Sequence, residues 1–203
     1  MLVGAAVKLT CANGTTLTGS TNGNGAYTTN QAGIAYPCVG TATSGAITYR
    51  GILFSGSTTN FTPLTEMLVQ VVLAASASGN ATLTQDQFLA KASADGTFAA
   101  NVTSATAITA YRNAVLDVAK AQLIEGGKTA AEADAILASA ANFDSVAFAL
   151  GSPLDKVLDN TASVLQNADG TVKSDVLADA QAAGNLLPTP TSGATGATGA
   201  SGG

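Results

Sequence analysis

The stretch Thr62-Pro-Leu-Thr-Glu-Met-Leu-Val-Gln-Val-Val-Leu-Ala-Ala75 decides the fold class, because the chain changes character on either side of it. Thr62 suits the N-cap of a helix, and Pro63 suits its first turn. Apolar residues then recur at helical spacing and cover nearly the whole circumference of the helix. The stretch therefore predicts a helix that lies at the centre of the molecule.

Before this helix, the apolar residues follow the pattern of short strands. Val7 and Leu9 alternate with polar neighbours, which is typical of a half-buried strand. Asn13-Gly14 is a strong hairpin signal, and further strands are predicted over residues 33–38 and 46–54. Several short strands between Gly-rich turns predict a small antiparallel β-sandwich.

After the central helix, the pattern stays helical. Capping-box signals precede several apolar runs, and a Gly follows the last of them as its expected C-cap. Further helices are predicted over residues 104–123, 130–141 and 145–150, from Ser152-Pro153 onward, and over 174–183 with Gly184 as the cap. The predicted fold is α+β: a β-sandwich over 1–60, an Ala-rich helical bundle over 61–187 and an extended tail over 188–203.

The tail begins with Pro and Thr and then repeats Gly-Ala-Thr. Gly recurs at every third position from Gly193 to Gly202, as in collagen. Three such triplets without Pro cannot sustain a triple helix, so a tail with no packing of its own is predicted. Order in this tail would require something to hold it, of which a neighbouring subunit is the simplest.

Composition excludes several functions. The chain has 203 residues, of which 46% are hydrophobic and 10% charged, and it contains no His. Imidazole catalysis and His metal sites are therefore excluded. The net charge of -5 argues against nucleic acid as a partner. The apolar run over residues 67–75 is too short to span a bilayer. We expect no cofactor and no enzymatic activity.

The charged residues are unevenly placed. Lys8 and Arg50 are the charged residues among the first 60, which carry no Asp or Glu. The remainder holds 13 acidic and 8 − 2 = 6 basic residues, which gives −7 against +2. Two interpretations stay open. The two segments of one compact protein simply differ in amino-acid composition, or their opposite charges bring copies of the chain together.

Cys11 and Cys38 are the two cysteines, and both fall at the ends of predicted strands. The absence of His and of any other thiol argues against a zinc site. They either form a disulfide or remain reduced in the core. We favour the disulfide because the composition is that of a secreted protein.

Three segments carry a resemblance to a known family. Gly4-Ala-Ala-Val-Lys-Leu-Thr-Cys11, Thr21-Asn-Gly-Asn-Gly-Ala-Tyr27 and Pro37-Cys38 resemble the carboxypeptidase-regulatory-like β-sandwich domain of bacterial secreted and lipid-anchored surface proteins. Asn22 stands where the family usually has Asp, and one extra residue precedes Tyr27. The resemblance covers about sixty residues and implies a noncatalytic module at the bacterial cell surface.

The predicted first strand suggests how copies could associate. Domains of this family usually have another strand before it, so the sequence predicts an open sheet edge at Val3, Ala5, Val7 and Leu9. Such an edge would be satisfied by a strand from a second copy. We therefore expect a noncatalytic, extracellular structural subunit of a filament or surface layer. The alternative is a monomeric adhesin or binding module of a bacterial envelope, with cell-surface or matrix contacts.

Acidic residues are the remaining candidates for acid/base catalysis or for other polar roles. Asp155 and Asp159 lie one helical turn apart and share a face, which we interpret as solvated. Glu66 is expected to interact with the N-terminus of the central helix.

One loop has part of a calcium-binding pattern. Residues 167–175 resemble the middle of an EF-hand loop, but Leu165 and Val176 stand where the first and last ligands would be. An Asp-Gly turn before a helix is the preferred interpretation, and no metal is expected.

Overall fold

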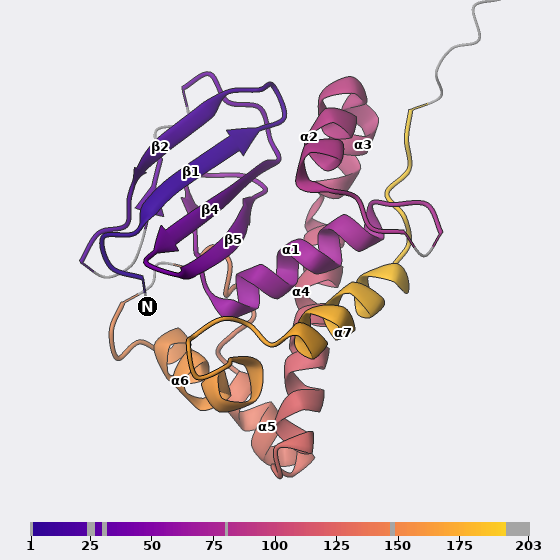
Figure 1. The fold of residues 1–203 in the computed structure, drawn as a ribbon. Helices are drawn as coiled ribbons and strands as arrows, with labels where there is room; N and C mark the ends of the chain where they lie inside the picture. Colours follow the sequence, from indigo (N-terminus) through magenta and orange to yellow (C-terminus); the bar gives the residue numbers. More distant parts are fainter. Residues whose placement is uncertain (1, 24–26, 30–31, 80, 147–148, 194–203) are drawn as a thin grey trace, which may run out of the picture.

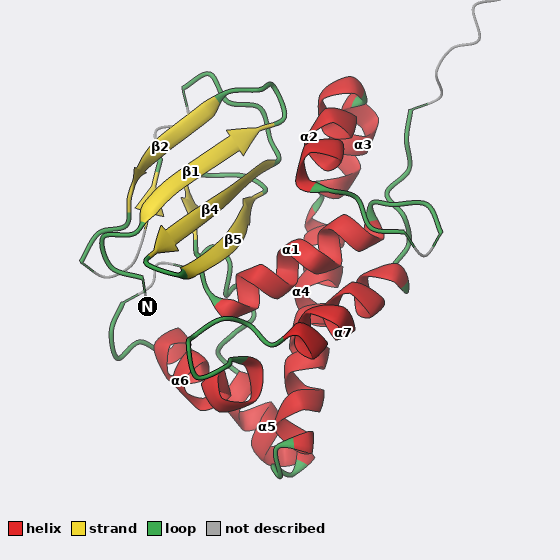
Figure 2. Cartoon of the chain, viewed as in Figure 1, coloured by secondary structure: helices red, strands yellow, loops and turns green. Residues whose placement is uncertain are grey.

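The computed structural model describes residues 2–23, 27–29, 32–79, 81–146 and 149–193. Its strands gather on one side of the molecule and its helices on the other (Figure 1, Figure 2). The described strands are β1 (Ala6–Cys11), β2 (Thr16–Ser20), β3 (Tyr27–Thr28), β4 (Cys38–Ser44), β5 (Ile47–Leu53) and β6 (Thr58–Thr59). The described helices are α1 (Pro63–Ala75), α2 (Gln85–Ala94), α3 (Gly96–Val102), α4 (Ala105–Glu125), α5 (Ala130–Leu137), α6 (Pro153–Leu165) and α7 (Ser174–Asn185). The predicted α+β class is confirmed.

The strands form a four-stranded antiparallel sheet in the order β2-β1-β4-β5 and a two-stranded sheet of β3 and β6. Leu9 in β1 lies opposite Leu17 in β2 and Gly40 in β4. A Cβ on Gly40 would come 2.7 Å from Leu9 Cδ1, so glycine is required where Leu9 packs over β4. The small residues of β4 therefore make room for larger residues of β1.

The predicted strand over residues 33–38 is wrong, because residues 32–37 form a turn and a loop and β4 starts at Cys38. Ile34 and Tyr36 nevertheless pack from this loop against the cluster of Leu9, the two cysteines and Leu53. Their alternate spacing thus reflects two side chains that cover the sheet rather than a strand within it.

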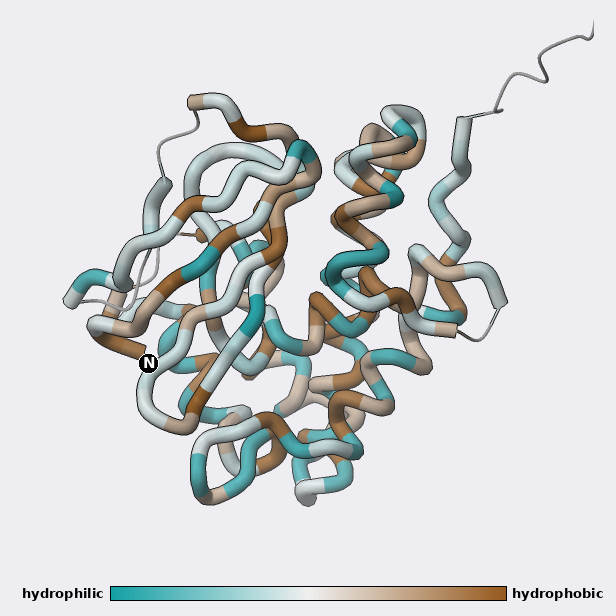
Figure 3. Tube along the Cα trace, turned by 45° about the horizontal axis from the view of Figure 1, so that its top comes forward, coloured by the Kyte–Doolittle hydropathy of each residue, from teal (hydrophilic) through white to brown (hydrophobic). Residues whose placement is uncertain are grey.

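Burial in β1 alternates as predicted: Val7 and Leu9 are buried, whereas Ala6 and Lys8 are exposed. The colouring by hydropathy in Figure 3 shows the same change between apolar and polar positions along the strands. Neighbouring strands bury the same face, so this face of the sheet forms part of the core.

The predicted central helix is confirmed in α1. It contacts β5, α4 and α7, and twelve of its thirteen residues are buried. Thr62 is its N-cap, and its Oγ1 accepts a hydrogen bond from the Thr65 amide at 3.2 Å. The Thr65 hydroxyl accepts one from the Thr62 amide at 2.8 Å, which completes the capping box with Thr in place of the usual Glu.

The sequence also predicts most of the remaining helix starts. Thr84, Thr129 and Ser152 cap α2, α5 and α6 through side-chain hydrogen bonds. The predicted helix over residues 145–150 is wrong, since none of its described residues is helical. No described helix is long and apolar enough to cross a membrane.

One hydrophobic cluster extends from the sheet into the helices. Val39 in β4 and Ile52 in β5 belong to it together with nearly the whole of α1 and buried residues of the later helices. The sheet face that packs on α1 is therefore continuous with the helical core.

Gly184, the predicted cap of the last helix, lies within α7 where α7 packs on α1. A Cβ at this position would lie 2.4 Å from the Val71 carbonyl oxygen and 2.9 Å from the Ala74 Cβ. The prediction is wrong because a close approach of two helices, rather than a turn, requires glycine here.

Gly184→Ala is expected to lower the free energy of unfolding by about 1–3 kcal/mol, because the added methyl group forces α7 away from α1. The higher helix propensity of Ala, about 1 kcal/mol, offsets part of this loss. Urea denaturation of this variant and of Gly96→Ala measures the effect. Gly96 lies in α3, where a Cβ would have no neighbour within 4 Å, so its substitution should cost no stability. A Gly184→Ala protein as stable as the parent would contradict the prediction.

Candidate functional site

The strand predicted to carry an open edge has none. β1 pairs with β2 along one side and with β4 along the other, so its backbone hydrogen bonds are used within the chain. Ala5, Val7 and Leu9 are buried, while Val3, just before β1, is 52% exposed. The prediction of a free edge at this strand is therefore wrong, because β4 occupies the place that a second copy was expected to fill.

The open edge lies instead at β2. The Thr15 carbonyl accepts from the Cys11 amide, and the Thr21 amide donates to the Ala5 carbonyl, so both residues face β1. Because backbone groups alternate in direction along a strand, Thr16, Thr18 and Ser20 point their amides and carbonyls away from β1. Within the described chain these groups have no hydrogen-bond partner.

The surroundings leave this edge accessible. Thr16, Thr18 and Ser20 are exposed, and a hollow of about 360 Å³ lies between β2 and the segment 27–29. The edge carries no charged residue and no Pro, which are the usual devices against pairing with other chains.

The opposite edge, at β5, is covered. Glu66 of α1 accepts a hydrogen bond from the Arg50 backbone amide at 2.6 Å and pairs with the Arg50 guanidinium. The Thr59 hydroxyl donates to the Ile52 carbonyl at 3.1 Å. Glu66 thus binds an edge strand, a role that its position at the start of the helix does not reveal.

Cys11 and Cys38 lie opposite each other in β1 and β4 and form a disulfide. The predicted pairing is confirmed. The bond lies in the core between the sheet and the loop that carries Ile34 and Tyr36.

Asp155 and Asp159 do share a face of α6, as predicted, and both line a cavity of about 100 Å³. Other walls of this cavity come from Leu2, from Asn60 and from the start of α1. Asp155 is half-buried and Asp159 exposed. The face interpreted as solvated is therefore one wall of a small cavity.

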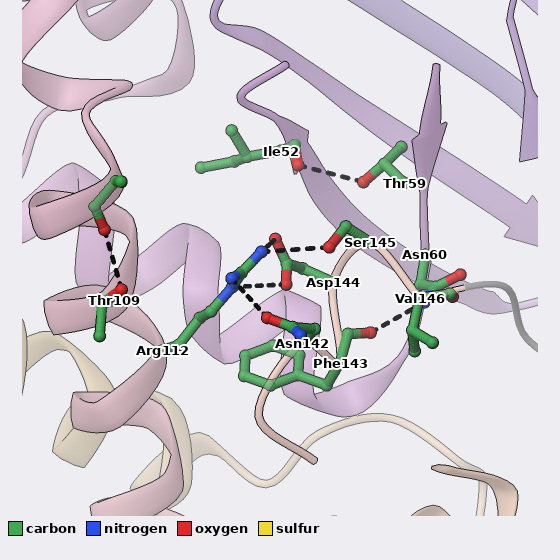
Figure 4. A network of polar contacts seen from close by, with 11 residues as sticks. Ile52, Thr59, Asn60, Thr109, Arg112, Asn142, Phe143, Asp144, Ser145 and Val146 are labelled. Atoms are coloured by element: carbon green, nitrogen blue, oxygen red, sulfur yellow. Dashed lines mark hydrogen bonds and ion pairs between the residues drawn. The ribbon is translucent and has the colours of Figure 1, made fainter. Parts of the chain in front are cut away.

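Asn60 joins the end of the sheet to the loop before α6 (Figure 4). Its Nδ2 donates to the Phe143 and Val146 carbonyls at 2.8 and 2.9 Å. Its backbone amide donates to the Asp144 carbonyl at 2.8 Å. The side chain of Asn60 is buried, and its Oδ1 has no hydrogen-bond partner in the described chain.

Arg112 of α4 holds the same loop from the other side. Its Nε and Nη2 donate to the two carboxylate oxygens of Asp144 at 2.8 and 2.9 Å, and its Nη1 donates to Asn142. Asp144 is 2% exposed. The bidentate ion pair thus fixes the loop to α4, while Asn60 fixes it to the end of the sheet.

The loop resembling a calcium site is a turn before α7. Gly170 has a φ of 85°, and Gln166 pairs with Val172 across the turn. The Asp169 carboxylate accepts from the Thr171 hydroxyl and amide, which lowers the pKa of Asp169. Over the described residues, no three Cys, Asp or Glu side chains gather as metal ligands.

The described start of the tail lies against α3 and the loop before it. Asn101 donates to the Thr191 carbonyl and hydroxyl at 2.9 and 2.7 Å. The Gly193 amide donates to the Asp95 carboxylate. The Phe98 amide, followed by that of Gly193, lowers the pKa of Asp95. The Gly-Ala-Thr repeat beyond Gly193 lies outside the described residues.

Comparisons of the chain with protein-family models, curated proteins and solved structures found no match.

Proposed function

We propose that this chain is a noncatalytic structural protein of the bacterial cell exterior that assembles with copies of itself, and that β2 provides the contact. The single observation that carries the proposal is the open, uncharged edge formed by Thr16, Thr18 and Ser20. The β region would then act as a sandwich-like module of the kind that the N-terminal motifs resemble.

A second copy of β2 fits this edge. If two β2 strands pair antiparallel with Thr18 opposite Thr18, each edge offers the amides and carbonyls that the other lacks. No like charges face each other across the pair. Lys8 lies one strand behind β2 in each copy, so the two ammonium groups lie three strand spacings apart, roughly 14 Å. Salt screens interactions between exposed charges beyond about 8–10 Å, so repulsion between these two ammonium groups is weak.

The disulfide supports a location outside the cytoplasm. Disulfides persist in oxidising compartments and are rare where glutathione keeps thiols reduced. The Cys11–Cys38 bond is therefore in keeping with a secreted or surface-exposed protein.

Thr18→Pro is expected to abolish assembly. Proline removes the outward amide of Thr18 and places its ring at the edge, while the hydrogen bonds of Leu17 and Gly19 to β1 remain. Thr18→Val is the matched control, because it keeps the amide and a β-branched side chain. Sedimentation velocity over a concentration series, with electron microscopy of the most concentrated sample, measures the outcome.

We expect concentration-dependent association of the parent chain and of Thr18→Val, and monomers for Thr18→Pro. A parent chain that stays monomeric at every concentration and salt would contradict self-assembly. Assembly of Thr18→Pro equal to that of the parent would show that another surface carries it.

A monomeric binding module at the bacterial surface is the second candidate. The cavity between α6 and the start of α1 is the observation that favours it, since it combines carboxylates with apolar walls.

A further inference from the structure

Besides its open backbone groups, β2 borders a hollow on the buried face of the sheet. Val7 lies opposite Gly19, and Leu9 lies opposite Leu17. Residues directly opposite each other in an antiparallel pair share a face, so Leu17 and Gly19 belong to the same face as the buried Val7 and Leu9. Both residues line the hollow of about 360 Å³, and Tyr27 lines it from the other side.

Gly19 and Leu17 differ in what they present at this edge. A Cβ on Gly19 would come 2.8 Å from Tyr27 Cε2, so the buried Tyr27 ring lies directly over a position without a side chain. Leu17 has an apolar side chain that is only half-buried, against the cluster of Leu9 and the two cysteines. The edge thus has a recess at Gly19 and a partly exposed apolar side chain at Leu17.

The direction of the backbone groups restricts how two copies of this edge can pair. Thr16, Thr18 and Ser20 carry the outward amides and carbonyls. In an antiparallel pair, all three residues of each copy find a partner within β2 only when Thr18 lies opposite Thr18 and Thr16 lies opposite Ser20. Any shift places at least one of them beyond the end of the other β2. In the aligned register, Leu17 of one copy lies opposite Gly19 of the other.

We propose that Leu17 of each copy enters the hollow beside Gly19 and Tyr27 of the other copy, and that this contact sets the register of the β2 pair. The inference rests on the proposed self-assembly through β2. Leu17 and Gly19 form a non-hydrogen-bonded pair, the type in which side chains approach most closely, so the leucine lies next to the Tyr27 ring. A water molecule occupies about 30 Å³ in the liquid, and a hollow of about 360 Å³ therefore has room for this side chain.

The contact is self-complementary, because the two-fold axis between the paired strands repeats it. Each copy contributes one leucine and one recess, so apolar surface is removed from water twice in each pair. An unrelated edge strand without a leucine at this position would form the backbone hydrogen bonds but leave the hollow unfilled. Leu17 therefore favours a second copy of this chain over other strands. Figure 1 shows β2 at the outer side of the sheet, away from α1, where a second copy can approach it.

Disulfide cross-linking of variants with one added cysteine tests the register. In the proposed pair, the Cα atoms of residue 18 in the two copies lie about 5.5 Å apart, a distance that a disulfide spans. Thr18→Cys is therefore expected to form a covalent dimer under mild oxidation. Cys11 and Cys38 are buried and already paired, so they do not compete for the added thiol. Non-reducing electrophoresis at several times of oxidation measures the rate.

Thr16→Cys is the matched control for cross-linking. It places the same thiol on the same edge, but residue 16 of one copy lies opposite residue 20 of the other. The two added cysteines are then four positions apart along the strands, roughly 14 Å, which is too far for a disulfide. We expect Thr16→Cys to remain free of the covalent dimer over the time in which Thr18→Cys forms it.

Leu17→Ala tests the contact itself. It is expected to raise the Kd of the pair about tenfold or more, since the apolar contact is lost twice in each pair. Leu186→Ala removes the same atoms from a side chain that is 87% exposed at the end of α7, so this control should associate as the parent does. Sedimentation velocity over a concentration series measures the Kd values, and circular dichroism shows whether each variant is folded. The cross-linking test keeps Leu17 in place, so it decides the register even if Leu17→Ala fails to fold.

The outcomes separate this inference from the proposed function. A parent chain that stays monomeric would overturn self-assembly through β2 and the role of Leu17 together. If the parent associates but Thr16→Cys cross-links as fast as Thr18→Cys, self-assembly stands and the proposed register is wrong. If folded Leu17→Ala associates as tightly as the parent, self-assembly likewise stands and the hollow does not receive Leu17.

Discussion

Replacement of Arg112 by Met is expected to lower the free energy of unfolding by about 3–5 kcal/mol. The guanidinium makes two hydrogen bonds to the Asp144 carboxylate, which is 2% exposed. Without Arg112 this carboxylate would remain buried and unpaired, and the loop that binds Asn60 would lose its attachment to α4. Urea denaturation followed by circular dichroism measures the loss.

Lys120→Met provides the matched control in the same helix. Lys120 pairs with Asp134 at 2.6 Å, but their side chains are 34% and 62% exposed. Exposed ion pairs contribute about 0–1 kcal/mol, so this substitution should cost at most about 1 kcal/mol. Equal losses in the two variants would contradict the view that burial of Asp144 sets the effect of Arg112.

Loss of the disulfide is expected to have a similar effect. Cys11 and Cys38 are 27 residues apart in sequence, and closing a loop of this length stabilises by roughly 3–4 kcal/mol in the chain-entropy model. The double variant Cys11→Ala, Cys38→Ala should therefore unfold at a lower urea concentration. The parent chain in reducing agent should unfold at a similarly reduced concentration.

The control for this prediction is the double variant treated with the same reducing agent. It has no disulfide to reduce, so its unfolding midpoint should not move. A double variant as stable as the oxidised parent would show that packing around Leu9 and Leu53, rather than the covalent bond, stabilises this part of the sheet.

The helices are the more predictable part of the fold, because their starts depend on local chemistry. Thr62, Thr84 and Thr129 each cap a helix through hydrogen bonds to residues three positions later. Because these hydrogen bonds join residues only three positions apart, a short stretch of sequence is enough to predict them. The role of Gly184 escapes a sequence pattern because it depends on Val71, which lies far away in the sequence.

The sheet is less predictable, since pairing joins residues from distant segments. β4 has Gly40 and Ala42 where large apolar residues would have indicated a strand, and their small size matters only once Leu9 lies above them. Without β4, the predicted β1 lacks its second neighbour. The family resemblance predicts an open edge at β1, and no local pattern indicates that β4 covers it.

The cavity is predictable only in part. The spacing of Asp155 and Asp159 places both on one face of a helix, but no local signal indicates Asn60. Its free oxygen results from hydrogen bonds to Phe143 and Val146, more than 80 residues away.

The contacts of Thr191 and Gly193 have a practical consequence for engineering. Asn101 and Asp95 hold the chain at these two residues, so a cargo joined directly after Gly193 would begin at a defined point of the surface. In Figure 1 this point lies on the helical side of the molecule, away from β2. A fluorescent label or an affinity handle attached there would leave the edge of the sheet unobstructed.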